Sequence, residues 1–289
     1  MVNGGNKVGI KFSILDEESE LVIGYCKEIE GLDGKIYFDG DLAYHKIELK
    51  QFVFCQKFKE YLVKRKESIS RLVYICIIDN DTNPIGKFRF SIYDDIYYHK
   101  TGVPESASDV TWRGSLNEIL SNKEIEIWNN WRISPPLKKN EWSSLSEDER
   151  RSWLKVVKNY NINKSECNEM QEGIFHLDGT FVTDYPSFFC ALGEAINGPG
   201  GYYGFDICSL IDCFYGGFDA TAPFTLIWNN HQIARKFLDI NSWVKEINYK
   251  RSWDDKLIDK PEFEEVGNRP LFQALIENME NEGVILVLN

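Results

Sequence analysis

Residues 201–216, which read GYYGFDICSLIDCFYG, have the types and spacing best suited to binding chemistry. Apolar residues recur there at helical spacing and predict a helix from about Asp206 to Tyr215, with one face in the core. That predicted core face comprises Ile207, Leu210, Ile211 and Phe214. Asp212 lies on the opposite side of such a helix, so we expect its carboxylate to project into solvent.

Small and aromatic residues surround this carboxylate. Its expected neighbours on the helix are Cys208, Ser209, Tyr215 and Gly216, and Tyr202, Tyr203 and Gly204 precede the helix. A carboxylate framed by tyrosines and glycines has the composition of a binding hot spot in a protein interface. The alternative is an ordinary solvated aspartate on an amphipathic helix.

About 115 residues at the C-terminus resemble the barstar family, intracellular inhibitors of the secreted ribonuclease barnase. The motifs that carry the resemblance are Asp178-Gly179 after a short strand, Tyr202-Tyr203-Gly204, Leu210, Asp212-Cys213, Gly216, Trp228 and Glu282-Gly283. The resemblance implies a three-stranded parallel sheet with packed helices. It also implies that the second helix and the loop before it insert into a nuclease active site.

The implied chemistry is charge replacement, because a fixed carboxylate can take the place of the phosphate that a basic nuclease cleft binds. The resemblance places Asp212 at the family's key aspartate. The chain departs from the family at Cys208, which replaces a second helix aspartate, and at Ile211, which replaces a tryptophan. The glutamate of the last helix falls at Asn278, and Asp206 adds a carboxylate at the helix start. A basic nuclease other than barnase is therefore the expected target.

Signals for catalysis, metals and cofactors are weak. The seven cysteines contain no CxxC pair and the four histidines have no HxxxH spacing, so we expect reduced, mostly buried thiols and no metal. The sequence has no GxSxG motif and no phosphate-cradling glycine loop of the P-loop or Rossmann type. We therefore expect a protein that is not an enzyme and has no cofactor.

Charge divides the chain unevenly. Residues 1–170 carry 27 acidic and 25 basic side chains, whereas residues 171–289 carry 18 acidic and 8 basic ones. The net charge of −12 argues against a nucleic-acid or anionic-membrane binder, and the acidic C-terminal part favours a basic protein partner. Ordinary solubilising surface charge is the alternative. Because the first residues lack an apolar signal region and no run of about 20 apolar residues exists, we expect a cytoplasmic protein.

The C-terminal part, residues 170–289, alternates strand and helix, which predicts a small parallel sheet with helical layers. We expect strands at 173–178 and 224–228, helices at 185–196 (capped by Asp184), 230–239 and from Pro270 to Gly283, and a last strand at 284–288 covered on both faces. Ile233, Phe237 and Leu238 are the expected core residues of the helix at 230–239. The polar stretch 240–268 is an insertion that either packs on its own domain or forms a second contact surface.

The N-terminal part, residues 1–165, is predicted to be a β-rich α+β domain. Hairpins are expected at 7–15 with 20–26 and at 71–78 with 86–93, the second around a turn at 79–84, and a helix at 51–66. Its tryptophans (Trp112, Trp128, Trp131, Trp142 and Trp153) are expected in a core. A capping box at Ser146 predicts a helix to about Tyr160, and the polar stretch 161–171 is the expected domain boundary.

The leading hypothesis is an immunity-type inhibitor, as in a toxin–antitoxin pair, which blocks a basic (ribo)nuclease toxin with the helix that carries Asp212. The alternative is a barstar-like scaffold that binds a protein without nuclease activity. The oligomeric state and the role of the N-terminal domain are not indicated by the sequence.

Overall fold

The computed structural model describes residues 9–65, 69, 71–94, 96, 102–163, 170–171, 173–251 and 269–289. Contacts divide the chain into two compact units, Met1–Ser134 and Pro135–Asn289. Within the described residues, no helix is long and apolar enough to cross a membrane.

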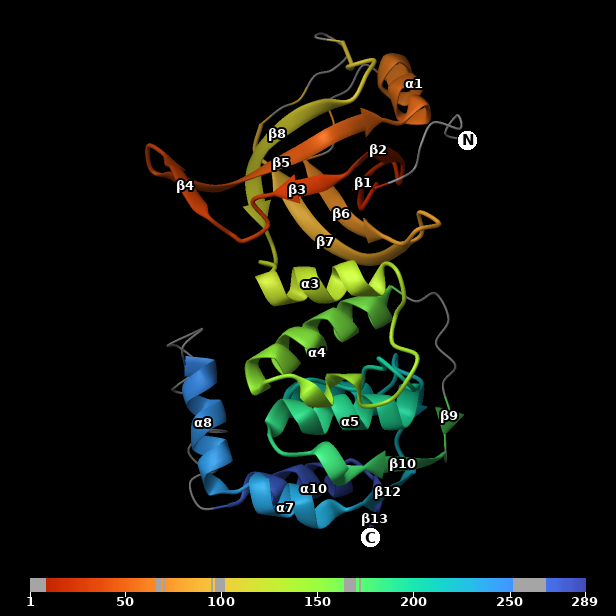
Figure 1. Cartoon of the computed structure of the whole chain (residues 1–289), viewed down its shortest axis with the longest axis vertical. Coiled ribbons are helices and arrows are strands. Elements are labelled where there is room, and N and C mark those ends of the chain that lie inside the picture. The colour runs from red at the N-terminus through yellow and green to blue at the C-terminus, as the bar shows by residue number, and fades with distance from the viewer. Residues whose placement is uncertain are drawn as a thin grey trace. The chain divides into compact units, whose positions relative to one another are not determined.

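The first unit is a closed six-stranded antiparallel β-barrel (Figure 1). Strands follow the order β2-β1-β6-β7-β8-β5, and pairing of β2 with β5 closes the barrel. The strands are β1 (Phe12–Asp16), β2 (Val22–Cys26), β3 (Glu28–Glu30), β4 (Ile36–Asp39), β5 (Leu42–Phe54), β6 (Leu72–Ile78), β7 (Pro84–Ile92) and β8 (Ser108–Leu116). Both predicted hairpins are present, as β1–β2 and β6–β7.

Apolar and polar residues alternate along the strands, and the apolar side chains fill the barrel interior, as expected for a barrel of this size. Helix α1 (Gln56–Arg65) buries Phe58 and Leu62 at one end, and α3 (Asn122–Trp131) lies at the other (Figure 1). The helix predicted to begin at residue 51 begins at Gln56, because the preceding residues still pair as β5. The five expected core tryptophans of the chain are all buried.

The second unit contains a three-stranded parallel sheet of order β10-β12-β13, as predicted. Its elements are η1 (Glu141–Ser144), α4 (Glu147–Ile162), β9 (Met170–Gln171), β10 (Ile174–Asp178), η2 (Gly179–Phe181), α5 (Tyr185–Asn197), α6 (Ile207–Phe214), β11 (Ala220–Thr221), β12 (Thr225–Asn229), α7 (His231–Phe237), α8 (Ile240–Arg251), α10 (Leu271–Asn281) and β13 (Ile285–Leu288). Local signals placed the helices correctly: Ser146, Asp184 and Asp206 form capping boxes at α4, α5 and α6.

One face of this sheet carries the core of the unit. Trp228 of β12 contacts Phe188 of α5 and Phe272 of α10, at ring-centroid distances of 5.3 Å each. The prediction that the last strand is covered on both faces is wrong, because β13 is an edge strand whose Ile285 and Val287 are exposed. Phe237 was also expected in the core, but α7 buries Ala234 instead.

The division between units falls at Ser134/Pro135, earlier than the polar stretch predicted at 161–171. Helix α4 belongs to the second unit, because its Arg150 forms an ion pair with Asp184 of α5 and the amide of Asn161 donates to the Gly200 carbonyl at 3.0 Å. Residues 164–169, which are most of the polar stretch, lie outside the described residues.

Candidate partner-binding site

Helix α6 is fixed at its N-terminus by its own sequence. The Asp206 carboxylate accepts from the Ser209 backbone N–H at 2.8 Å, and the Ser209 hydroxyl accepts from the Asp206 N–H at 2.9 Å. The N–H of Ile207 donates to the Tyr185 hydroxyl at 3.0 Å. These bonds satisfy three backbone groups that a helix start leaves free, so α6 begins at a defined residue.

The loop before α6 lies very close to the helix. Gly204 has φ +88°, and a Cβ there would lie 3.0 Å from backbone atoms of Leu210. A side chain at this position would therefore be strained and would push the loop away from α6. The glycine in the Tyr-Tyr-Gly motif is thus explained by packing.

Tyr202 and Tyr203 do not frame the site as predicted. Both rings are buried, and the Tyr203 hydroxyl donates to the carbonyls of Cys213 at 3.3 Å and Ala220 at 2.8 Å. Burial raises the pKa of both phenols. Their role in this fold is to support α6 from beneath.

The exposed face of α6 consists of Cys208, Ile211, Asp212 and Tyr215, which follow the i, i+3, i+4, i+7 spacing of one helical stripe. Cys208 and Asp212 are exposed, Ile211 is half-buried, and Tyr215 is 75% exposed. Of the four residues predicted to form the core face, Leu210 and Phe214 are buried, whereas Ile207 and Ile211 are only partly covered. Cys213 takes the remaining buried position.

Asp212 is the exposed carboxylate at the centre of this stripe, as the sequence predicts. Among the described residues, no hydrogen bond or ion pair engages its side chain, whereas its backbone carbonyl accepts from Tyr215. Gly216 follows with φ +118° and ends the helix. The arrangement presents one free anionic group on a rigid element.

A second carboxylate lies beside the stripe and was not predicted as a site residue. The Tyr215 hydroxyl donates to Glu282 Oε2 at 2.9 Å, and this bond raises the pKa of Tyr215. Glu282 follows α10, which packs against α6. The two residues are 67 positions apart, so helical spacing could not bring them together. Asn278, at which the resemblance implies a glutamate, donates to the Ala274 carbonyl of its own helix.

Asp206, by contrast, is engaged within the molecule. Lys250 of α8 lies 3.2 Å from its second carboxylate oxygen. Burial alone would raise the pKa of Asp206, but the Ser209 N–H and the Lys250 charge outweigh burial and lower it. Asp206 is therefore a helix cap and an internal ion-pair partner more than a free contact group.

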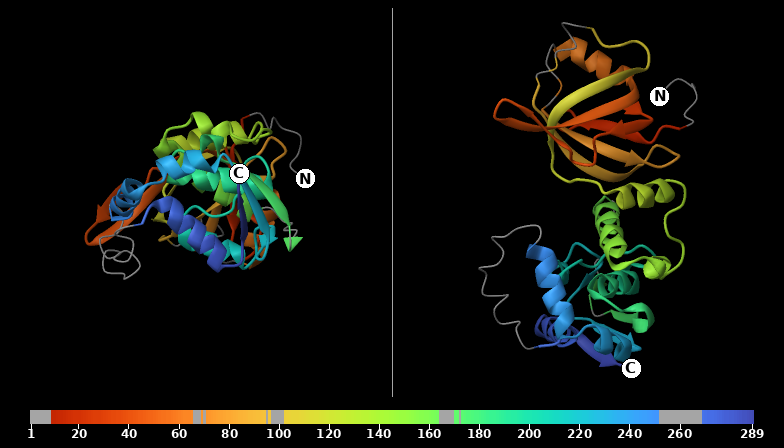
Figure 2. Two further views of the ribbon diagram at one scale, coloured as in Figure 1. Left: turned by 90° about the horizontal axis from the view of Figure 1, so that it is seen from below. Right: turned by 60° about the vertical axis from the view of Figure 1, so that its left-hand side comes forward.

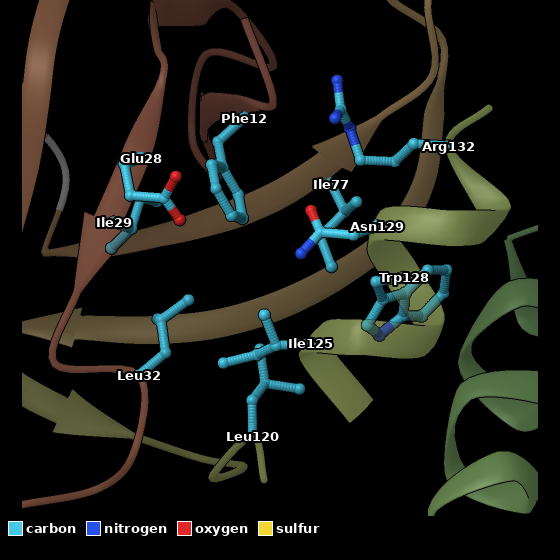
Figure 3. A pocket seen from close by; sticks show the side chains of 10 residues that line it. All are labelled: Phe12, Glu28, Ile29, Leu32, Ile77, Leu120, Ile125, Trp128, Asn129 and Arg132. Atoms are coloured by element: carbon cyan, nitrogen blue, oxygen red, sulfur yellow. The ribbon is translucent and has the colours of Figure 1, made fainter. Parts of the chain in front are cut away.

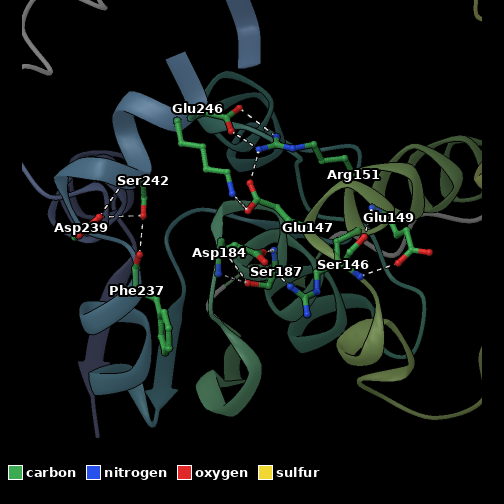
Figure 4. A network of polar contacts seen from close by, with 12 residues as sticks. Ser146, Glu147, Glu149, Arg151, Asp184, Ser187, Phe237, Asp239, Ser242 and Glu246 are labelled. Carbon is green, nitrogen blue, oxygen red and sulfur yellow. Dashed lines mark hydrogen bonds and ion pairs between the residues drawn. The ribbon is translucent and has the colours of Figure 1, made fainter. Parts of the chain in front are cut away.

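Helix α8 forms ion pairs with Asp206 at the start of α6 and with residues of α4, so the 240–251 part of the insertion packs on its own domain. The buried Glu246 forms an ion pair with Arg151 of α4 at 2.7 Å, and Lys245 forms one with Glu147 (Figure 4). The Trp243 side chain is also buried. The other part of the insertion, residues 252–268, lies outside the described residues.

The remaining candidate features are metal-ligating side chains, thiols and a cavity. No group of three or more His, Cys, Asp or Glu side chains in the described part of the chain could hold a metal. Cys26, Cys76, Cys190 and Cys213 are buried, and burial raises the pKa of Cys213 to about 12. A cavity between the barrel and α3 is lined mainly by apolar side chains (Figure 3). Its two charged residues are already engaged, Glu28 with Lys11 and Arg132 with the Ile78 and Ile10 carbonyls.

Comparison of the sequence with protein-family models and with curated proteins finds no match to either.

Proposed function

We propose that the second unit is a non-catalytic inhibitor that blocks the active site of a basic nuclease, with Asp212 as its central contact. The observation that carries this proposal is the unpaired, exposed Asp212 carboxylate on a rigidly capped helix. The topology of the unit, a three-stranded parallel sheet with helices, supports it because the resemblance to the barstar family implies that topology.

The geometry suits a phosphate-binding cleft. A nuclease that holds phosphate with arginine, lysine or histidine can donate charge-assisted hydrogen bonds to a carboxylate in the same position. Glu282 and Tyr215 extend the contact beside Asp212 with a second acid and an exposed ring. Tyrosine rings are favourable in such interfaces because they bury a large area with few rotatable bonds.

The net charge of the unit assists encounter with a basic partner. Residues 135–289 carry 24 acidic and 15 basic side chains. Complementary charge accelerates association, and salt screens this effect. Inhibition of a cognate toxin inside the producing cell is the physiological role that we infer.

Capture of partners on wild-type protein and on Asp212→Ala tests the proposal, with each captured protein assayed for cleavage of RNA and DNA. We expect wild type to retain a basic nuclease and inhibit it, and Asp212→Ala to weaken binding by about 2–5 kcal/mol, because a cation of the partner loses its counter-charge on burial. Asp148→Ala is the matched control, since it removes an exposed carboxylate from α4 of the same unit. Inhibition equally strong with Asp212→Ala would contradict the proposed mode.

A second candidate is the same surface bound to a protein without nuclease activity. The replacements at Cys208 and Ile211 favour it, because together with Phe205, which is 40% exposed, they make this surface more apolar. Capture of such a partner in an Asp212-independent manner would select this candidate.

A further inference from the structure

The hairpin formed by β4 and the first residues of β5 extends beyond the barrel wall (Figures 1 and 2). Asp39 pairs with Leu42 across a two-residue loop, and Gly40 has φ +60°. Glycine with positive φ at the first loop position is typical of a type II′ turn, which fits the twist of a two-stranded hairpin. The turn thus fixes the register of β4 on β5.

The two faces of this hairpin differ in how far other side chains shield them from solvent. On one face, Tyr37 and Tyr44 stack at 5.8 Å, with Lys35 over the first ring and Arg113 over the second. On the other face, Ile36 is 55% exposed and Phe38 is 72% exposed. Neighbouring large apolar side chains on one exposed strand are typical of a surface that contacts another chain.

The outer edge of β4 has free backbone groups. The pair that closes a two-residue hairpin loop is hydrogen-bonded, and hydrogen-bonded pairs then alternate along the ladder. The N–H and C=O groups of Asp39 and Tyr37 therefore face β5, and those of Ile36 and Phe38 face outward. Among the described residues, β4 pairs with β5 alone. Such an edge can accept a further strand.

We propose that β4 pairs with β4 of a second copy of this chain, antiparallel about a two-fold axis at Tyr37. In this register Ile36 lies opposite Phe38 of the other copy, and their outward N–H and C=O groups form the hydrogen-bonded pairs. On the opposite face, Lys35 lies opposite Asp39 of the other copy, so each copy supplies both a cation and an anion. The sequence Lys-Ile-Tyr-Phe-Asp is thus complementary to itself in apolar character and in charge.

The contact is small, since four residues of strand bury far less than the 800 Å² or so per partner of a standard interface. We therefore expect reversible dimerisation with micromolar dissociation constants. Within the described part of the chain, Lys35 forms no ion pair, whereas Asp39 pairs with Arg113 at 3.0 Å, and Arg113 keeps its pair with Asp94 when Asp39 is replaced.

Sedimentation velocity of the full chain, at concentrations from about 1 to 200 μM in about 0.15 M salt, tests the proposal. We expect wild type to shift from monomer toward dimer, and Lys35→Asp or Asp39→Lys each to raise the dissociation constant at least about fivefold by placing like charges opposite one another. The double variant should restore the wild-type value. Val63→Lys, which changes a 69% exposed residue on α1, is the matched control and should dimerise as wild type does.

A cysteine at the two-fold axis tests the register independently. A non-hydrogen-bonded antiparallel pair has its Cα atoms about 4.5 Å apart, within the range of a disulfide. In a Cys208→Ser background, Tyr37→Cys should form a cross-linked dimer under mild oxidation, and Val63→Cys should not. A wild-type chain that stays monomeric throughout, or a dimer that ignores both charge reversals, would overturn the proposal.

Discussion

Two aspartates on or beside the same short helix have opposite environments, and the difference assigns their roles. Asp206 accepts from a backbone N–H and from Lys250, so its charge is used to hold α6 in place. Asp212, six residues later, meets no partner in the described residues and is exposed. A carboxylate that is satisfied internally stabilises the fold, whereas a free one on a rigid element is suited to a partner.

Replacement of Asp206 tests this division. Asp206→Ala should destabilise the second unit by about 1 kcal/mol through loss of the cap, and Asp206→Asn by less, because asparagine also caps helices. The folded-state pKa of Asp206 is lowered, so its ionised form stabilises the fold above the unfolded pKa, and this contribution is lost as the pH falls through the folded pKa. Thermal unfolding at pH 7 and below about pH 3 measures the effect. An equal deficit for Asp206→Ala at both pH values would contradict the ionic part of this role.

At the scale of elements, α8 connects the first turns of α4 and α6, and α5 also holds the start of α6. Helix α8 supplies Glu246 to Arg151 of α4 and Lys250 to Asp206 at the start of α6, and Tyr185 at the start of α5 holds the first N–H of α6. Arg151 also lies 3.8 Å from the centre of the Tyr249 ring. The buried Arg151–Glu246 pair stabilises this cluster only while both charges are present.

Removing either charge of the Arg151–Glu246 pair should therefore be costly. Glu246→Ala should destabilise the second unit by about 3 kcal/mol, because the buried Arg151 would keep only Glu147 as a counter-charge. The exposed Lys245→Ala should cost no more than about 0.5 kcal/mol. Amide hydrogen exchange of α8 measures both, and we expect protection to fall in the first variant only. Equal protection in the two variants would show that the ion pair does not hold α8.

What the sequence predicted at this scale depended on how local each signal is. Capping boxes at Ser146, Asp184 and Asp206 involve residues three positions apart, so the starts of α4, α5 and α6 could be predicted. Burial depends on residues that are distant in the sequence, so the exposed side of β13 and the buried ring of Tyr203 could not be predicted. The contact of Tyr215 with Glu282 was hidden for the same reason.

At the scale of the whole molecule, the second unit begins at Pro135, well before residue 170, where the sequence predicted the C-terminal domain to begin. Helix α4 buries Trp153, Leu154, Val156 and Val157, and it packs against α5. The buried Glu194 of α5 also accepts from the Asn140 N–H at 2.7 Å, although burial raises its pKa. The segment 135–162 is thus part of the unit that presents α6.

Two fragments distinguish this organisation from a minimal inhibitor domain. Residues 135–289 should fold alone, whereas residues 170–289 should not, because four buried side chains of α4 contribute about 1.5–3 kcal/mol each. Their sum is comparable with the total stability of about 5–15 kcal/mol that a domain has. Loss of α4 also leaves Asp184 without Arg150 and the buried Glu246 without Arg151. Circular dichroism and NMR chemical-shift dispersion of the two fragments provide the measurement. A cooperative, well-dispersed fragment 170–289 would contradict this boundary and return it to the polar stretch 161–171.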